Sequence, residues 1–172
     1  MTNKKELIDD WLKEIAGLQH SDPELSFKKN EEVLAACREQ QYEIGYGLAL
    51  NNKGNYYFWR DEAATALEWY VEADKILSKS NDWEDAIIAK TNMAMVYSKI
   101  NEAEKSLRLY RFIENIIEHQ SLNIKQAQVY MNIDVVLLAM GQVAEAKKYA
   151  LKGYAICKQL NHAFGISLSA NH

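Results

Sequence analysis

The sequence has little proline, glycine or cysteine. Its 172 residues include one proline and seven glycines, and 48% of them are hydrophobic. Because proline and glycine interrupt regular structure, this composition argues against a disordered chain and predicts an all-helical protein. The two cysteines, Cys37 and Cys157, match neither a zinc-binding nor a redox spacing. We expect them to be buried free thiols.

The chain also lacks an excess of positive charge and a long apolar run. Its net charge of -4 predicts no broad basic surface for nucleic acid. The longest apolar run, residues 135–140, is far too short to span a bilayer. Residues 1–11 contain several acidic side chains and no signal-peptide core. These absences predict a cytoplasmic protein with neither a nucleic-acid partner nor a membrane partner.

Motifs that carry catalytic or metal chemistry are missing as well. The sequence has no glycine-rich phosphate loop, no H-E-x-x-H, no G-x-S-x-G and no cysteine pair. Its histidines lack the spacing of metal ligands and are expected at the surface or at helix ends: His20, His119, His162 and His172. The carboxylates are spread along helix faces that we expect to be solvated. The sequence therefore predicts no enzyme, no cofactor and no metal.

What the sequence does contain is a repeat of 40 residues. Asn52, Asn92 and Asn132 recur at this spacing. Three more sets follow the same period: Tyr57, Tyr97 and Leu137; Ala66, Ser106 and Ala146; Ile76, Ile116 and Ile156. A fixed period of this size indicates a repeat architecture, in which each unit buries its apolar face against its neighbours.

Each repeat is predicted to be a pair of helices. Apolar residues fall at helical spacing over 48–59, and a second helical segment over 62–79 begins after Asp61. Because the connection is so short, the two helices must run antiparallel as a hairpin. In later repeats we expect Asn101 to cap a second helix and Gly141 to end a first helix as its C′ residue.

The motif of the repeat resembles a known family. N-x-G-x-x-Y, followed by two alanines that flank a tyrosine, resembles the tetratricopeptide repeat, in its long variety that is common in bacterial regulatory proteins. These residues are Asn52, Gly54, Tyr57, Ala66, Tyr70 and Ala73. The likeness is closest over 45–82, weaker over 85–122, where Ala94 replaces the glycine, and weakest over 125–162, where Asp134 replaces it.

The resemblance implies an all-α fold. We expect a right-handed superhelix, an α-solenoid of antiparallel helix hairpins with about 3.5–4 units, as one domain over residues 1–172. Residues 1–40 would form a divergent capping repeat, and 163–172 the truncated first helix of a further repeat. The intact repeats are predicted over 45–82, 85–122 and 125–162.

The resemblance also implies a concave groove, lined by the first helices, in which a peptide or partner segment lies. Mapped by register, the groove residues are Asn51, Asn52, Asn55, Phe58, Trp59, Asn92, Met95, Lys99, Gln128 and Asn132. An asparagine amide donates and accepts, so a ladder of them can pair with the backbone of an extended peptide, as in some relatives. The alternative is that these asparagines make local contacts between repeats.

Three functional hypotheses follow. The first is a protein- or peptide-binding scaffold, although not of the chaperone-binding type, because the lysines and arginines that bind a carboxylate there are missing. The second is the N-terminal sensory or dimerisation module of a larger bacterial signalling protein, of the diguanylate cyclase or histidine kinase type. The third, a freestanding enzyme, is disfavoured by the uncharged groove.

A homodimer through the C-terminal end is a further expectation. The last full helix would have only two turns of chain to cover its far side, so an apolar strip would stay exposed. The residues of this strip are Tyr154, Phe164, Ile166 and Leu168.

Overall fold

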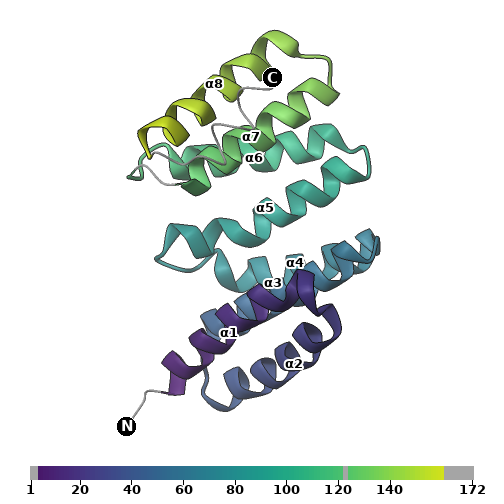
Figure 1. Cartoon of the computed structure of the whole chain (residues 1–172), viewed down its shortest axis with the longest axis vertical. Coiled ribbons are helices and arrows are strands. Elements are labelled where there is room, and N and C mark those ends of the chain that lie inside the picture. Colours follow the sequence, from purple (N-terminus) through teal and green to yellow (C-terminus); the bar gives the residue numbers. More distant parts are fainter. Residues whose placement is uncertain (1–3, 122–123, 161–172) are drawn as a thin grey trace. The chain divides into compact units, whose positions relative to one another are not determined.

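All regular secondary structure in the described part of the chain is α-helical (Figure 1). The structure is a computed structural model and describes residues 4–121 and 124–160. Its helices are α1 (Lys4–Ser21), α2 (Pro23–Glu39), α3 (Glu43–Trp59), α4 (Ala63–Leu77), α5 (Trp83–Lys99), α6 (Ala103–Ile117), α7 (Ile124–Ala139) and α8 (Val143–Gln159). The predicted all-α fold of helical hairpins, an α-solenoid, is confirmed. Among the described residues, no helix is both long and apolar enough to cross a lipid bilayer.

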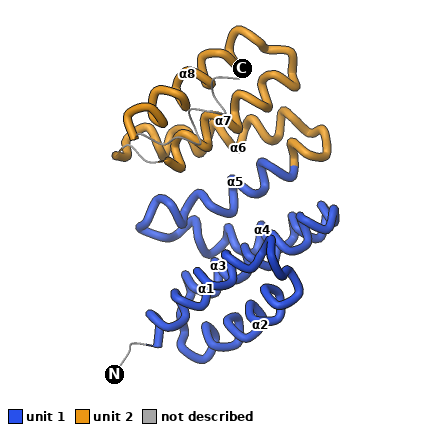
Figure 2. The backbone as a smooth tube through the Cα atoms, in the orientation of Figure 1, with its two compact units in different colours: residues 1–96 blue, residues 97–172 orange. Residues whose placement is uncertain are grey.

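The chain divides into two compact units (Figure 2). Unit 1 is Met1–Val96 and unit 2 is Tyr97–His172, so the boundary falls near the end of α5. In unit 1, α1 packs against α2 and α3, α2 packs against α3, and α3 packs against α4. In unit 2, α6 packs against α7 and α7 packs against α8. Within each unit, therefore, consecutive helices form the layers of the solenoid.

The start of α2 follows from its local sequence. The side chain of Asp22 caps the helix by accepting a hydrogen bond of 3.0 Å from the backbone N–H of Leu25. Pro23 occupies the first helical position, where its missing N–H costs nothing. This boundary ends the first helix at Ser21 and places α1 and α2 side by side.

The turn inside three of the hairpins uses a left-handed residue. Asp61, Asn101 and Gly141, 40 residues apart, have φ values of 62°, 62° and 73°. After each of them the next backbone N–H closes the preceding helix: Glu62 to Tyr57, Glu102 to Tyr97 and Gln142 to Leu137, at 2.8–3.0 Å. The predicted C′ role of Gly141 is thus confirmed. The predicted cap at Asn101 is wrong, because Glu102 is the N-cap residue and its side chain makes no cap hydrogen bond. Asn101 instead supplies the positive φ that asparagine tolerates.

A close approach of α3 and α4 explains the glycine of the motif. A Cβ atom on Gly54 would lie 2.5 Å from the ring of Tyr70. That ring is 1% exposed and forms a core cluster with Ala66 and Val96. Only glycine at position 54 leaves room for the buried tyrosine, so the motif residues Gly54 and Tyr70 are a packing pair.

Both cysteines are buried free thiols, as predicted. Burial, and then the negative charge of Asp9, raise the pKa of Cys37 to about 11, and burial also raises the pKa of Cys157. Because the thiolate is the reactive form, we expect both thiols of the folded protein to react with Ellman's reagent at pH 8 far more slowly than free cysteine. In urea, two thiols per chain should react at once. Rapid reaction of either thiol without urea would contradict the burial described here.

Candidate functional site

Three of the predicted groove asparagines share one hydrogen-bonded network in unit 1. The Nδ2 group of Asn92 donates to Oδ1 of Asn51 at 2.8 Å and to Oδ1 of Asn55 at 3.1 Å. The Tyr70 hydroxyl donates to the same Asn55 oxygen at 2.9 Å. Asn51 is 1% exposed. These amides therefore join α3, α4 and α5, which is the local role that the sequence left open as an alternative.

Gln19 extends this network and was missed by the sequence analysis. Its Nε2 group donates to Oδ1 of Asn52 at 3.1 Å, and its Oε1 accepts from Nδ2 of Asn55 at 3.3 Å. Gln19 lies 40 residues before Trp59, itself a predicted groove residue. The repeat register could therefore have identified it, although the first helix of that repeat has lost the motif residues.

The larger of two cavities in unit 1, cavity 1, lies among α1, α2 and α3 and has a volume of about 260 Å³. Its lining residues are Gln19, Pro23, Ser26, Phe27, Asn30, Asn52, Tyr56, Trp59 and Arg60. Asn30 is 2% exposed, and its Nδ2 group donates to the Ala49 carbonyl at 2.9 Å. Its Oδ1 atom is buried without a hydrogen-bond partner. Cavity 1 thus combines aromatic walls with an unsatisfied acceptor.

The rim of cavity 1 is charged. Arg60 pairs with Glu24 at 2.9 Å, and its guanidinium lies 5.1 Å from the centre of the Tyr56 ring. The Tyr56 hydroxyl donates to Glu24 at 3.0 Å. Partial burial, and then this bond to a carboxylate, raise the pKa of Tyr56. The rim therefore carries a paired cation and anion beside the aromatic wall.

Cavity 2 is smaller, about 120 Å³, and brings together five of the predicted groove residues. These are Asn55, Phe58, Trp59, Asn92 and Met95, joined by Gln19, His20 and Tyr70. Burial raises the pKa of Tyr70, so its hydroxyl stays protonated and keeps its bond to Asn55. The cavity is lined by amides at one side and by aromatic and thioether groups at the other.

Trp59 stands on the edge of both cavities. Its side chain is 55% exposed, although its ring contacts His20 at 5.1 Å and Phe58 at 5.2 Å between centroids. A large exposed indole beside two cavities is the type of group that binding surfaces use as an anchor.

The other predicted groove residues belong to unit 2 and line neither cavity. Lys99 and Gln128 are exposed. Asn132 hydrogen-bonds to the hydroxyl of Tyr110, which opposes the increase in the pKa of this tyrosine caused by burial. Of the strip expected to mediate a dimer, Tyr154 is half-buried on α8. Phe164, Ile166 and Leu168 lie outside the described residues.

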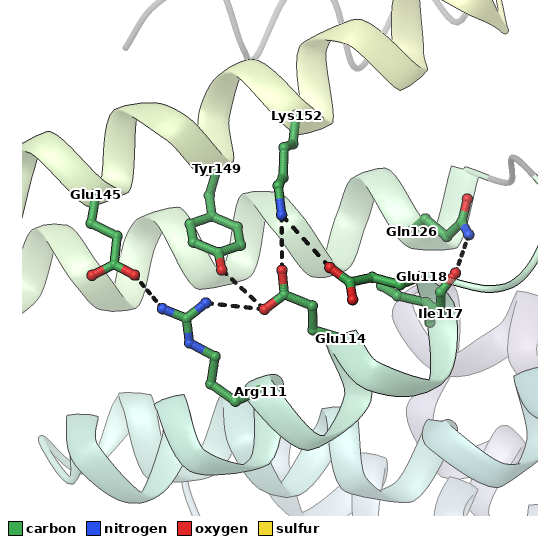
Figure 3. Close-up of polar contacts among 8 residues, drawn as sticks. All are labelled: Arg111, Glu114, Ile117, Glu118, Gln126, Glu145, Tyr149 and Lys152. Atoms are coloured by element: carbon green, nitrogen blue, oxygen red, sulfur yellow. Dashed lines mark hydrogen bonds and ion pairs between the residues drawn. The ribbon is translucent and has the colours of Figure 1, made fainter.

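Unit 2 contains a buried carboxylate that the sequence analysis placed on a solvated face (Figure 3). Glu114, on α6, is 6% exposed. It accepts from the Tyr149 hydroxyl at 2.9 Å, and it pairs with Arg111 and with Lys152, each at 3.0 Å. Arg111 also pairs with Glu145. Because Glu114 accepts from three donors, this cluster holds α6 to α8 and has the chemistry of a structural contact.

Comparisons with known proteins concern the fold. No protein-family model and no curated protein sequence matches the chain. Among solved structures, aspartyl phosphate phosphatase F from Bacillus subtilis is similar with a TM-score of 0.86 at 12% identity, over 99% of this chain and 45% of that one. BtubC (BKLC) from P. vanneervenii is similar with a TM-score of 0.75 at 13% identity, over 94% of this chain and 67% of that one. The chain thus spans less than half the length of the first. At such identities the likeness shows a fold of helical hairpins, in agreement with a tetratricopeptide-like repeat.

Proposed function

We propose that this chain is a non-catalytic scaffold that binds a protein or peptide segment on the face of unit 1 that bears Trp59. The observation that carries the proposal is the exposed indole between cavities 1 and 2. Because each cavity is smaller than a typical small-molecule pocket, the pair suits neighbouring side chains of one segment better than a single cofactor.

The polar groups of this face support an extended ligand. Asn52 uses its Oδ1 for Gln19, which leaves its Nδ2 hydrogens for a carbonyl of the bound backbone. Asn51 is too deeply buried to reach a ligand, so the predicted ladder is reduced to the amides that line the cavities, Asn52, Asn55 and Asn92. Binding would then combine one aromatic anchor with a few amide contacts.

A second candidate function is a sensory or dimerisation module within a longer signalling protein. It is favoured by the first structural neighbour, in which the matched fold occupies 45% of the chain. That neighbour is a phosphatase of aspartyl phosphate, but 12% identity gives no reason to extend its activity to this chain. The two candidate functions are compatible, because a module of this kind also acts by binding a partner.

Replacing Trp59 with alanine should weaken the binding of peptides selected from a random library at least tenfold. The indole would be the buried centre of the interface, where truncation has its largest effects. Binding is measured by fluorescence anisotropy of labelled peptides. Trp11→Ala is the matched control, since Trp11 is also exposed (38%) and lines neither cavity. Equal affinities of the Trp59 variant and the wild type, with the helical spectrum intact, would remove this face from the function.

A further inference from the structure

Cavity 1 lies where the next repeat has a tyrosine ring. Asn30 is 40 residues before Tyr70, whose ring is 1% exposed in the core. The lining residues Ser26, Phe27 and Tyr56 correspond in the same way to Ala66, Leu67 and Val96. Ala66 and Val96 form a core cluster with Tyr70, and Leu67 packs against it. The walls are thus repeated, and the ring between them is replaced by a short amide.

The following repeat keeps the ring as well. Tyr110, 40 residues after Tyr70, is 1% exposed, and Asn132 hydrogen-bonds to its hydroxyl. Asn52, which lines cavity 1, is the equivalent of Asn132. In two successive repeats this position therefore holds a phenol, and in one of them an asparagine of this register bonds to its hydroxyl.

The substitution at position 30 leaves a polar demand as well as space. The bond from Asn30 Nδ2 to the Ala49 carbonyl fixes the orientation of the amide, so the buried acceptor is Oδ1. A buried acceptor without a donor is unfavourable, and an incoming hydroxyl would satisfy it. The space is sufficient, since a cavity of about 150 Å³ already binds benzene and cavity 1 has about 260 Å³.

We propose that cavity 1 receives a phenol ring from a bound segment, a tyrosine side chain whose hydroxyl donates to Oδ1 of Asn30. The guest ring lies between Phe27, Tyr56 and Trp59 and supplies what Tyr70 supplies in the next repeat. This assignment rests on the proposed function for the segment that carries the tyrosine. A free phenolic molecule has the same chemistry, whereas ordered water would satisfy Asn30 but leave the aromatic walls uncovered.

The test uses small probes that need no peptide. The whole chain is titrated with p-cresol and with toluene, followed by Trp59 fluorescence and by the ¹H–¹⁵N signals of the Asn30 amide and the Trp59 indole. We expect p-cresol to shift both signals and to bind about five- to tenfold more tightly than toluene, because only p-cresol has a donor. Failure of p-cresol to bind, or equal binding of toluene, would overturn the inference.

Two variants separate the ring from the hydrogen bond. Asn30→Tyr restores the ring of the other repeats and should abolish p-cresol binding. Asn30→Leu removes the acceptor and should make p-cresol and toluene bind alike. Asn115→Leu, the same change at an exposed position on α6 that lines neither cavity, should bind p-cresol as the wild type does. If Asn30→Tyr fails to fold, the Leu variant alone decides, because retained preference for p-cresol would overturn the role of Asn30.

A capped peptide, acetyl-Gly-Tyr-Gly-amide, distinguishes the two sources of the ring. Competition between this peptide and p-cresol would support a tyrosine of a bound segment. Binding of p-cresol without the peptide would overturn that source and assign the cavity to a free phenolic molecule. The proposed function fails separately, when no library peptide binds or when the Trp59 variant binds as the wild type does, whatever the result with p-cresol.

Discussion

Replacing Tyr70 with alanine should lower the free energy of unfolding by about 3–5 kcal/mol, the range for deleting a buried aromatic side chain. The ring is 1% exposed, packs against Gly54 in the core, and its hydroxyl holds the asparagine network through Asn55. The truncation would leave a large cavity at this place. Urea unfolding, followed by circular dichroism at 222 nm, measures the loss.

Tyr70→Phe is the control for this experiment. It keeps the ring and removes only the hydrogen bond to Asn55, so the loss should be about 1 kcal/mol. If the alanine variant lost no more than the phenylalanine variant, the packing of Tyr70 against Gly54 would not be a main contact of unit 1.

Replacing Glu114 with alanine should cost about 2–3 kcal/mol of stability. Removing one partner of a buried ion pair commonly costs about 3–5 kcal/mol. The expected loss is smaller here, because the side chains of Arg111 and Lys152 are 37% and 45% exposed and regain water. Tyr149, at 6% exposed, does not, and its hydroxyl would lose its acceptor. The same urea experiment measures the change.

The matched control is Glu104→Ala, which removes an exposed carboxylate from the first turn of the same helix. A change at such a position is usually within about 0.5 kcal/mol. Similar losses for the two glutamates would show that the cluster around Glu114 contributes no more than an ordinary surface charge.

The sequence predicted the helices because each repeat states the same pattern three times. Gly54 and Tyr70 belong to the motif, and the structure shows them as a packing pair. The turn was only partly foreseen: Gly141 is a C′ residue, whereas Asn101 resembles a cap by type. Reading Asp61, Asn101 and Gly141 together would have corrected it, since a position shared with glycine indicates a positive φ.

The cavities were not predicted, because they depend on how neighbouring repeats differ. Asn51 and Asn52 are adjacent in α3, yet Asn51 is buried under Asn92 and Asn52 lines cavity 1. Helical periodicity alone places both near one face and leaves their depth open. Asn30 lies in a repeat that lost the motif of its first helix, so its register with Tyr70 became informative only when the structure showed space there.

Gln19 gives this face a property that neither cavity has alone. One end of its amide donates to Asn52 in cavity 1, and the other accepts from Asn55 in cavity 2. A group that displaces Gln19 on entering one cavity also removes a hydrogen bond from the other. The two affinities are therefore thermodynamically linked, and the linkage is reciprocal: each occupant changes the dissociation constant of the other by the same factor. Selectivity then belongs to a pair of neighbouring side chains in one ligand, and two separate fragments would not reproduce it.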